Sequence, residues 1–364
     1  MKKIIFCVTN DLVTDQRMMR ICSTLAEDGY EVELVGRLRK NSTTVVAKSS
    51  KQTRLKCWFD AGKLFYVEYN IRLFFYLIFR RFDILGAVDL DTILPVYLVS
   101  KLRFKPATFD AHEYFEEVPE VSDRAFVKKI WTIVGNWCVP RMKLCYTVGP
   151  ALADIFTKKY KRPFHVIRNM PIQKDIASVQ LPLIAQPYLL YQGALNEGRG
   201  LEPMIEAMNN LAEYRLIIAG DGYLKEELIF AVKKYGLQKR VIFTGNLDPD
   251  QLDGFTAGAY VGLNLLENKG KSYYYSLANK FFDYVQFGIP VLTMDFPEYA
   301  ALNKEYEVAV LIDNLRPETI IKQLQLLHSD LSLHTRLRMN CLKAKKQWIW
   351  EGEATRLKEL YHMI

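Results

Sequence analysis

The chain has 364 residues, half of them hydrophobic, which is more than the ~250–300 residues at which single cores stop growing and so predicts two domains. Residues 1–180 hold 29 Lys and Arg against 19 Asp and Glu, and residues 181–364 hold 20 against 22. The basic surplus therefore lies in the first half, but no zinc-finger or RNA-recognition signature indicates nucleic acid as a partner. The six cysteines form no Cys-x-x-Cys pair and no zinc-spaced Cys/His cluster, which argues against a structural zinc and indicates a reduced, cytoplasmic protein.

The first half alternates short apolar runs with helical patterns. Strands are predicted at residues 3–9, 30–36, 82–88, 108–109 and 143–148, and a helix at residues 15–29. This succession predicts a parallel sheet. Asp15 is expected to cap the helix with Arg17 as its partner. The first apolar run ends at Thr9, too early for a signal peptide, and no run approaches the ~20 residues of a membrane span.

Two features of the first half bear on chemistry. His112 lies between Asp110 and Glu113 at the end of a predicted strand, which adds weight to a functional role beside the structural one. Residues 70–81 and 128–138 are aromatic runs with cationic flanks. Each run is either a buried helix with solvated ends or a face that contacts an anionic membrane, and both interpretations stay open.

The second half repeats the pattern after a proline-containing linker at residues 171–187. Strands are predicted at residues 188–191, 215–219, 241–244, 261–265 and 290–293, with helices at 201–211 and 344–361. The sequence therefore predicts an α/β fold of two Rossmann-like domains, residues 1–170 and 188–343, that face each other across a cleft. A C-terminal helix is expected over residues 344–364.

Residues 276–291 predict a helix followed by a buried strand. Ser276 suits the helix N-cap, and Gly288 suits the left-handed residue that ends it. Asn279 and Asp283 are four residues apart and share one face, with Lys280 beside them. A helix N-terminus with a cation and a carboxylate at a sheet edge suits a nucleotide diphosphate and its ribose.

This segment resembles the donor-site helix of retaining GT-B-fold glycosyltransferases of the family 4, or group 1, type. The family motif there is N-K-[LF]-[FY]-E-Y followed by G-x-P-V. This chain matches it with Asn279-Lys-Phe-Phe-Asp283-Tyr and Gly288-Ile-Pro-Val, in which Asp283 replaces Glu. Shorter resemblances to the same family lie at residues 191–202, 216–222, 243–247 and 110–113. The tail around Trp348 and Glu353 resembles a helix that crosses back to the first domain in this family.

The resemblance implies a role for each candidate residue. Arg199 and Lys280 would clamp the donor diphosphate, Asp283 would bind the ribose, and His112 would bind the donor sugar or support the reaction centre. Further donor contacts are implied for Gly193, Gly220, Gly222, Asn246, Leu277 and Asn279. No metal is expected, and no cofactor is expected because the nucleotide-sugar is a substrate.

The implied activity is transfer of a sugar, with retention, to a hydroxyl of a saccharide or lipid-linked saccharide in polysaccharide or glycan biosynthesis. The enzyme would be cytoplasmic and would contact the inner face of the cell membrane through its basic first half. Tyr275 departs from the family, which has a sugar-binding Glu eight residues before the ribose-binding acid. A nucleotide-sugar epimerase of the same fold and a catalytically weakened sugar-binding scaffold protein remain as alternatives.

Overall fold

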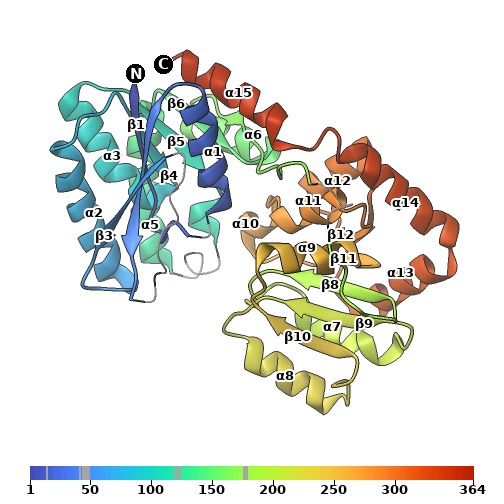
Figure 1. Cartoon of the computed structure of the whole chain (residues 1–364). Coiled ribbons are helices and arrows are strands. Elements are labelled where there is room, and N and C mark those ends of the chain that lie inside the picture. Colours follow the sequence, from blue (N-terminus) through green and yellow to red (C-terminus); the bar gives the residue numbers. More distant parts are fainter. Residues whose placement is uncertain (14, 41, 43–49, 119–120, 122–123, 175–178) are drawn as a thin grey trace. The chain divides into compact units, whose positions relative to one another are not determined.

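A computed structural model describes residues 1–13, 15–40, 42, 50–118, 121, 124–174 and 179–364 (Figure 1). The chain divides into two compact units. The first comprises Met1–Asn169, Gly270–Ser272 and Glu351–Ile364, and the second comprises Met170–Lys269 and Tyr273–Trp350. Residues 175–178 of the expected linker lie outside the described residues.

The described part of the first unit contains a seven-stranded parallel sheet in the order β3-β2-β1-β4-β5-β6-β7. Its strands are β1 (Lys3–Cys7), β2 (Glu31–Leu38), β3 (Lys51–Lys56), β4 (Ile84–Val88), β5 (Ala107–Ala111), β6 (Leu144–Thr147) and β7 (His165–Val166). The central strands β4, β5 and β6 are buried along their whole length, as expected of a parallel sheet that helices cover on both faces.

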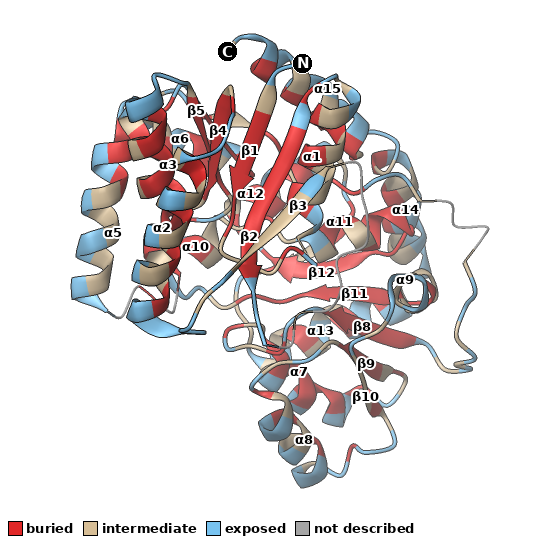
Figure 2. Ribbon diagram, turned by 60° about the vertical axis from the view of Figure 1, so that its left-hand side comes forward, coloured by how far each residue is buried: buried red, intermediate tan, exposed pale blue. Residues whose placement is uncertain are grey.

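The helices of the first unit are α1 (Gln16–Glu27), α2 (Gly62–Ile78), α3 (Leu90–Arg103), α5 (Ala125–Cys138), α6 (Pro150–Tyr160) and α15 (Trp350–His362), with 3₁₀ turns at Phe115–Glu117 and Val139–Arg141. Helix α3 lies between α2 and α5 and packs against both (Figure 2). Helix α15 places Tyr361 in the core, where its hydroxyl lies 3.1 Å from the hydroxyls of Thr108 and Tyr146.

In the described part of the second unit, six parallel strands form a sheet in the order β10-β9-β8-β11-β12-β13. They are β8 (Tyr188–Gln192), β9 (Arg215–Ala219), β10 (Val241–Gly245), β11 (Val261–Asn264), β12 (Val291–Met294) and β13 (Ala309–Ile312). The helices are α7 (Leu201–Ala207), α8 (Lys225–Lys234), α9 (Pro249–Ala257), α11 (Asn279–Gln286), α12 (Pro297–Glu305), α13 (Pro317–Ser329) and α14 (Leu331–Ala344), with a 3₁₀ turn at Met208–Asn210. Helix α10 (Gly270–Tyr274) is divided by the unit boundary, since Gly270–Ser272 belong to the first unit.

The strand order in each sheet reverses direction next to its first strand. In the second unit β8 lies between β9 and β11, and in the first unit β1 lies between β2 and β4. Ligands of open parallel sheets bind at the carboxyl ends of the strands at such a switch point. The fold therefore directs attention to the loops after β8 and β11 and to those after β1 and β4.

The expected helix over residues 344–364 is wrong as a single element. Helix α14 ends at Ala344 and α15 begins at Trp350, with turn residues between them. Trp348 lies in that turn and is buried against the rings of Phe281 and Phe282. The indole is thus part of the core of the second unit, whereas the last helix belongs to the first.

Candidate active site

The loops after β8 and β9 approach each other closely through glycines. Gly193 and Gly220 have φ values of 129° and 145°, which favour glycine. A Cβ on Gly220 would lie 2.0 Å from the carbonyl oxygen of Gly193, and one on Gly222 would lie 2.4 Å from that of Leu195. The packing of the two loops therefore already requires Gly220 and Gly222, and a donor contact from either residue remains a prediction.

Helix α11 presents Asp283 beside the carboxyl end of β8. The Gln192 Nε2 donates a hydrogen bond of 3.0 Å to Asp283 Oδ2, and the Thr256 hydroxyl donates one of 2.9 Å to Gln192 Oε1. Because a carboxylate can only accept hydrogen bonds, the Gln192 amide must turn its Nε2 toward Asp283, and this hydrogen bond orients the carboxylate. Asn279 begins the same helix and is exposed.

The prediction that Ser276 caps α11 is wrong. The N-cap is Ala278, and the Ser276 hydroxyl donates instead to the carbonyl oxygen of Tyr273 at 2.8 Å. The Ala278 amide donates to the Tyr299 hydroxyl at 3.0 Å. The helix accordingly starts without a side-chain cap, and its first-turn amides keep the partial positive charge of a helix N-terminus.

Two cations lie next to this helix start. The Lys280 Nζ is 3.7 Å from the ring centroid of Tyr191, and a Cβ on Gly193 would be 3.6 Å from the same Nζ. The Arg199 guanidinium carbon is 4.9 Å from the ring centroid of Tyr273, and its buried Nε has no hydrogen-bond partner among the described residues. Burial and the charge of Arg199 hold the pKa of Lys280 well below its ordinary value. An anion bound here, such as a diphosphate, would accept a hydrogen bond from the Arg199 Nε and would raise the pKa of Lys280.

The remaining candidates of the second unit differ in what their side chains can contact. Asn246 follows β10 after Gly245, whose φ is 71°, and its side chain is exposed. Leu277 is 8% exposed and packs in the hydrophobic core, so only its backbone could contact a donor. Tyr275 follows α10 and contacts the ring of Tyr274, with centroids 4.9 Å apart.

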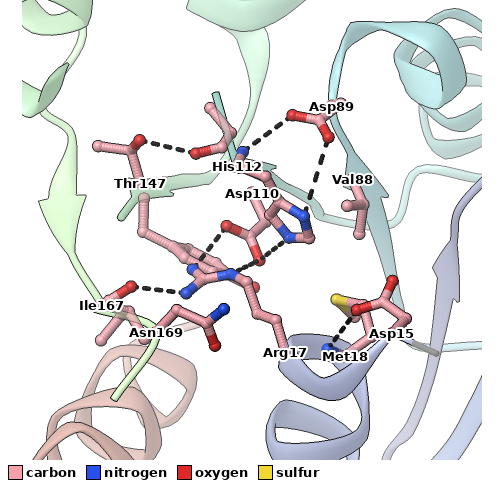
Figure 3. A network of polar contacts seen from close by, with 12 residues as sticks. Asp15, Arg17, Met18, Val88, Asp89, Asp110, His112, Thr147, Ile167 and Asn169 are labelled. Carbon is pink, nitrogen blue, oxygen red and sulfur yellow. Dashed lines mark hydrogen bonds and ion pairs between the residues drawn. The ribbon is translucent and has the colours of Figure 1, made fainter. Parts of the chain in front are cut away.

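A buried polar network occupies the carboxyl ends of β4 and β5 in the first unit (Figure 3). Arg17 donates two hydrogen bonds to Asp110, of 3.1 and 2.8 Å, and a third of 2.8 Å to the carbonyl oxygen of Ile167. Asp15 caps α1 as expected by accepting from the Met18 amide at 2.9 Å, but it is not the hydrogen-bonded partner of Arg17. Burial opposes ionisation of Asp110, and the charges of Arg17 and His112 outweigh it and lower the pKa of that carboxyl.

His112 is held between two acidic side chains, Asp110, whose pKa is lowered, and Asp89, whose pKa burial raises to about 8. Its Nε2 lies 3.0 Å from Asp110 Oδ2, its amide donates to Asp89 Oδ1 at 2.8 Å, and its Nδ1 is 3.9 Å from Asp89 Oδ2. Burial would lower the pKa of His112, but Asp110 and Asp89 raise it to about 9. The side chain is therefore an imidazolium at neutral pH. Its Nδ1–H is too far from Asp89 for a good hydrogen bond.

Asp89, which contacts His112, and Arg17, which pairs with Asp110, are functional candidates that the sequence did not reveal. Asp89 follows β4 with a φ of 55°, a conformation that costs free energy for a residue with a side chain and that occurs often at functional sites. An acidic residue directly after a buried strand is the signal that points to Asp89. Within the described parts of the chain, no group of three or more His, Cys, Asp or Glu side chains could hold a metal ion.

Residues 173–348 match the family model described as Glycosyl transferases group 1. They form a group 1 glycosyl transferase domain. The domain contains both cations, the oriented Asp283 and the glycine loops described above. The match covers just under half of the chain and, with the solved structures described next, supports the predicted glycosyltransferase enzyme. No curated protein sequence matches the chain.

Solved structures of GT-B enzymes superpose on the chain of this glycosyl transferase over its whole length. Sucrose-phosphate synthase from Thermosynechococcus elongatus is 16% identical with a TM-score of 0.79, covering 100% of this chain and 99% of that chain. HepE from Anabaena, in complex with UDP and glucose, is 13% identical with a TM-score of 0.77, covering 100% of both. A putative UDP-N-acetylglucosamine 2-epimerase from Listeria monocytogenes is 14% identical with a TM-score of 0.63, covering 98% and 95%. At these identities the likeness shows the fold alone, and it confirms the predicted two-unit α/β fold of the GT-B class.

Substitution of Asp283 tests the oriented carboxylate. We expect Asp283→Asn to weaken nucleotide binding, with UDP as the probe, by roughly 1.5–3 kcal/mol, the range for hydrogen bonds to charged groups. The matched control is Asp253→Asn on α9, whose carboxylate is paired with Lys174 instead. Isothermal titration with UDP makes the comparison, and an Asp283→Asn variant that binds UDP as tightly as the wild type would contradict the assignment.

Proposed function

We propose that this glycosyltransferase moves a sugar from a nucleotide-sugar to a hydroxyl of a saccharide or lipid-linked saccharide, with retention, in polysaccharide or glycan biosynthesis. The observation that carries the proposal is the pair of cations, Arg199 and Lys280, beside the uncapped start of α11 and the oriented Asp283. These groups lie in the group 1 domain, at the switch point of its sheet.

The reaction breaks the bond between the anomeric carbon and the diphosphate oxygen and forms one between that carbon and the acceptor oxygen, whose proton passes to the leaving nucleoside diphosphate. Negative charge develops on this leaving group as its bond breaks. Arg199, Lys280 and the first-turn amides of α11 are fixed in advance where that charge would lie, which is how preorganised sites lower a barrier. Asp283 would accept hydrogen bonds from the ribose hydroxyls. The His112 imidazolium would donate its Nδ1 proton in a hydrogen bond to the donor sugar.

A two-stage experiment tests the function. Isothermal titration with UDP, GDP and ADP identifies the nucleotide, with UDP first because HepE was solved with UDP and glucose. Mass spectrometry then follows matching nucleotide-sugars with and without saccharide acceptors. Release of free nucleotide that requires an acceptor supports transfer, and release without one indicates the epimerase. Failure to bind any of the three nucleotides indicates the scaffold protein.

We further propose that the first unit contacts an anionic membrane through α2 and α5. Each helix exposes apolar side chains at helical spacing, all between 42% and 69% exposed: Leu64, Val67, Ile71 and Phe75 on α2, and Phe126, Ile130, Ile133 and Trp137 on α5. Helix α2 also buries a second apolar stripe, so one of its faces packs in the core and the other is exposed. None of the described helices is long and apolar enough to cross a membrane.

Vesicle flotation tests this contact. The protein should float with anionic vesicles at low salt and stay below with neutral ones, because each Lys or Arg near an anionic surface adds about 1 kcal/mol. Added salt should weaken the interaction, since surface charges are screened over ~8–10 Å. Equal flotation with both vesicles, or with neither, would remove the electrostatic argument without affecting the donor site.

A further inference from the structure

A polar pocket and an apolar groove share a wall in the first unit. The pocket, of about 250 Å³, lies where β1 and β2 end and α2 begins. The groove, of about 580 Å³, lies between α2 and α5 over Leu94 of α3. Gly62 and Tyr66 line both, so the two cavities adjoin at the N-terminal turn of α2. Figure 2 shows α2 and α5 with exposed outer faces in this unit.

The polar pocket is built around a buried arginine. Arg37 is 9% exposed, its Nη1 donates to the carbonyl oxygen of Asp60 at 2.9 Å, and its guanidinium carbon is 4.1 Å from the ring centroid of Phe65. Its Nε is buried and has no hydrogen-bond partner among the described residues. Burial and the neighbouring charge of Arg39 both lower the pKa of Arg37.

Charge in the polar pocket is therefore unbalanced toward the positive. Arg37 and Arg39 both line it, and the carboxylate that lines it, Asp60, is 3.8 Å from the ammonium of Lys40. Thr9 and Asn10 also line the pocket, and their side chains donate to Asp91 and Asp15. The two guanidinium groups suit the oxygens of a phosphate.

The groove is lined mainly by apolar side chains, among them Val67, Leu94, Val127, Ile130, Trp131 and Val134. The charged residues among its described lining are Lys63 and Arg124, both cations. Its volume falls in the range of pockets that hold small ligands, about 300–1,000 Å³. A hydrocarbon chain fits this lining, and an anion next to the chain fits the cations.

We propose that the two cavities together bind one amphiphile, with a phosphate or diphosphate group in the Arg37 pocket and its hydrocarbon chain in the groove. The occupant is the lipid phosphate carrier of a lipid-linked acceptor. Two observations select it: the shared wall at Gly62 and Tyr66, and the match between cationic pocket, apolar groove and anionic, chain-bearing ligand. This inference rests on the proposed function, since it names the acceptor class of that reaction.

The test compares three probes by isothermal titration below the micelle concentration: farnesyl phosphate, farnesol, which has the chain alone, and inorganic phosphate. We expect farnesyl phosphate to bind about ten-fold or more tightly than farnesol, because charge-assisted hydrogen bonds form only with the phosphate. Inorganic phosphate should neither bind measurably nor displace farnesyl phosphate at equal concentration, because the chain supplies the apolar part of the affinity.

Two variants, each with a matched control, test where the phosphate and the hydrocarbon chain of the ligand bind. Arg39→Gln should weaken farnesyl phosphate about ten-fold and leave farnesol unchanged, with Arg356→Gln, an exposed arginine of α15, as its matched control. Val134→Phe should weaken both chain-bearing probes by filling the groove, with Leu102→Phe, at an exposed site of α3, as its control.

UDP titration of every variant shows that the donor site is folded and separates this proposal from the proposed function. Loss of farnesyl phosphate binding in Arg39→Gln and Val134→Phe, with UDP affinity retained, supports the amphiphile site. Equal binding of farnesol and farnesyl phosphate, equal binding of inorganic phosphate, or no binding of any probe while UDP still binds would each overturn it. Failure of the wild type to bind any of UDP, GDP and ADP would overturn the proposed function instead.

Discussion

Replacing His112 by Ala is expected to reduce turnover about a hundred-fold or more while changing nucleotide affinity less than two-fold. The reason is that its partner in the proposed mechanism is the donor sugar, which the nucleotide alone does not carry. Steady-state turnover with a matching nucleotide-sugar and titration with the nucleotide give the two numbers. The matched control is His165→Ala, a histidine of the same unit on β7.

Retained turnover in His112→Ala would indicate that this histidine has only a structural role. The pH dependence of the unfolding free energy measures that structural role separately. The folded state raises the pKa of His112 to about 9 from 6.5, so the proton stabilises the fold. That contribution is fully present below about pH 6.5 and is lost as the pH rises through about 9. Burial raises the pKa of Asp89 to about 8, whereas the pKa of Asp110 is lowered, so Asp110 is the charged partner of His112 near pH 6. Denaturant unfolding of wild type and His112→Gln should therefore differ most near pH 6 and less near pH 10.

Alanine at Arg199 or Lys280 is expected to weaken UDP binding about ten- to a hundred-fold and to leave uridine binding unchanged. Each cation interacts with the diphosphate, and charge-assisted hydrogen bonds contribute about 1.5–3 kcal/mol each. Isothermal titration with both ligands makes the comparison. Lys225→Ala is the matched control, because Lys225 is paired with Asp221 in a neighbouring loop. Equal weakening of UDP and uridine binding would indicate that these residues contact the base or stabilise the fold, and do not contact the diphosphate.

The pH dependence of UDP affinity gives a second measure of Lys280. Its pKa is held well below the ordinary value in the free site, and a bound diphosphate would raise it. The bound state therefore holds the proton more tightly than the free state. UDP affinity should fall as the pH rises through the lowered pKa of the free lysine, and this fall should disappear in Lys280→Ala.

Much of the fold was predictable because buried parallel strands are short apolar runs. The strand at residues 215–219 was predicted at its observed bounds, and most other strands were placed within two or three residues. Strand β3 was missed because Lys51–Lys56 carries three charged residues at an edge of the sheet, where one side of the strand faces solvent. Periodicity also failed at the end of the chain, where the turn around Trp348 interrupts an otherwise helical pattern.

The site was less predictable than the fold because its contacts join distant residues. Local motifs placed Lys280 and Asp283 on one helix, but only the structure shows that Gln192, 91 residues earlier, orients the acid. Arg17 and Asp110 are 93 residues apart, and no local spacing pairs them. The cap at Ser276 was wrong for the opposite reason, since a local rule lost to a tertiary bond from Ala278 to Tyr299.

The discontinuous first unit has a consequence for the order in which this protein acquires its structure during synthesis. Residues 1–169 leave the ribosome well before Glu351–Ile364, yet Tyr361 supplies the hydroxyl that meets Thr108 and Tyr146 in their core. The nascent first unit therefore presents an uncovered apolar surface around these residues while the whole second unit is translated. Chaperones that recognise exposed apolar segments would have their longest opportunity during that interval.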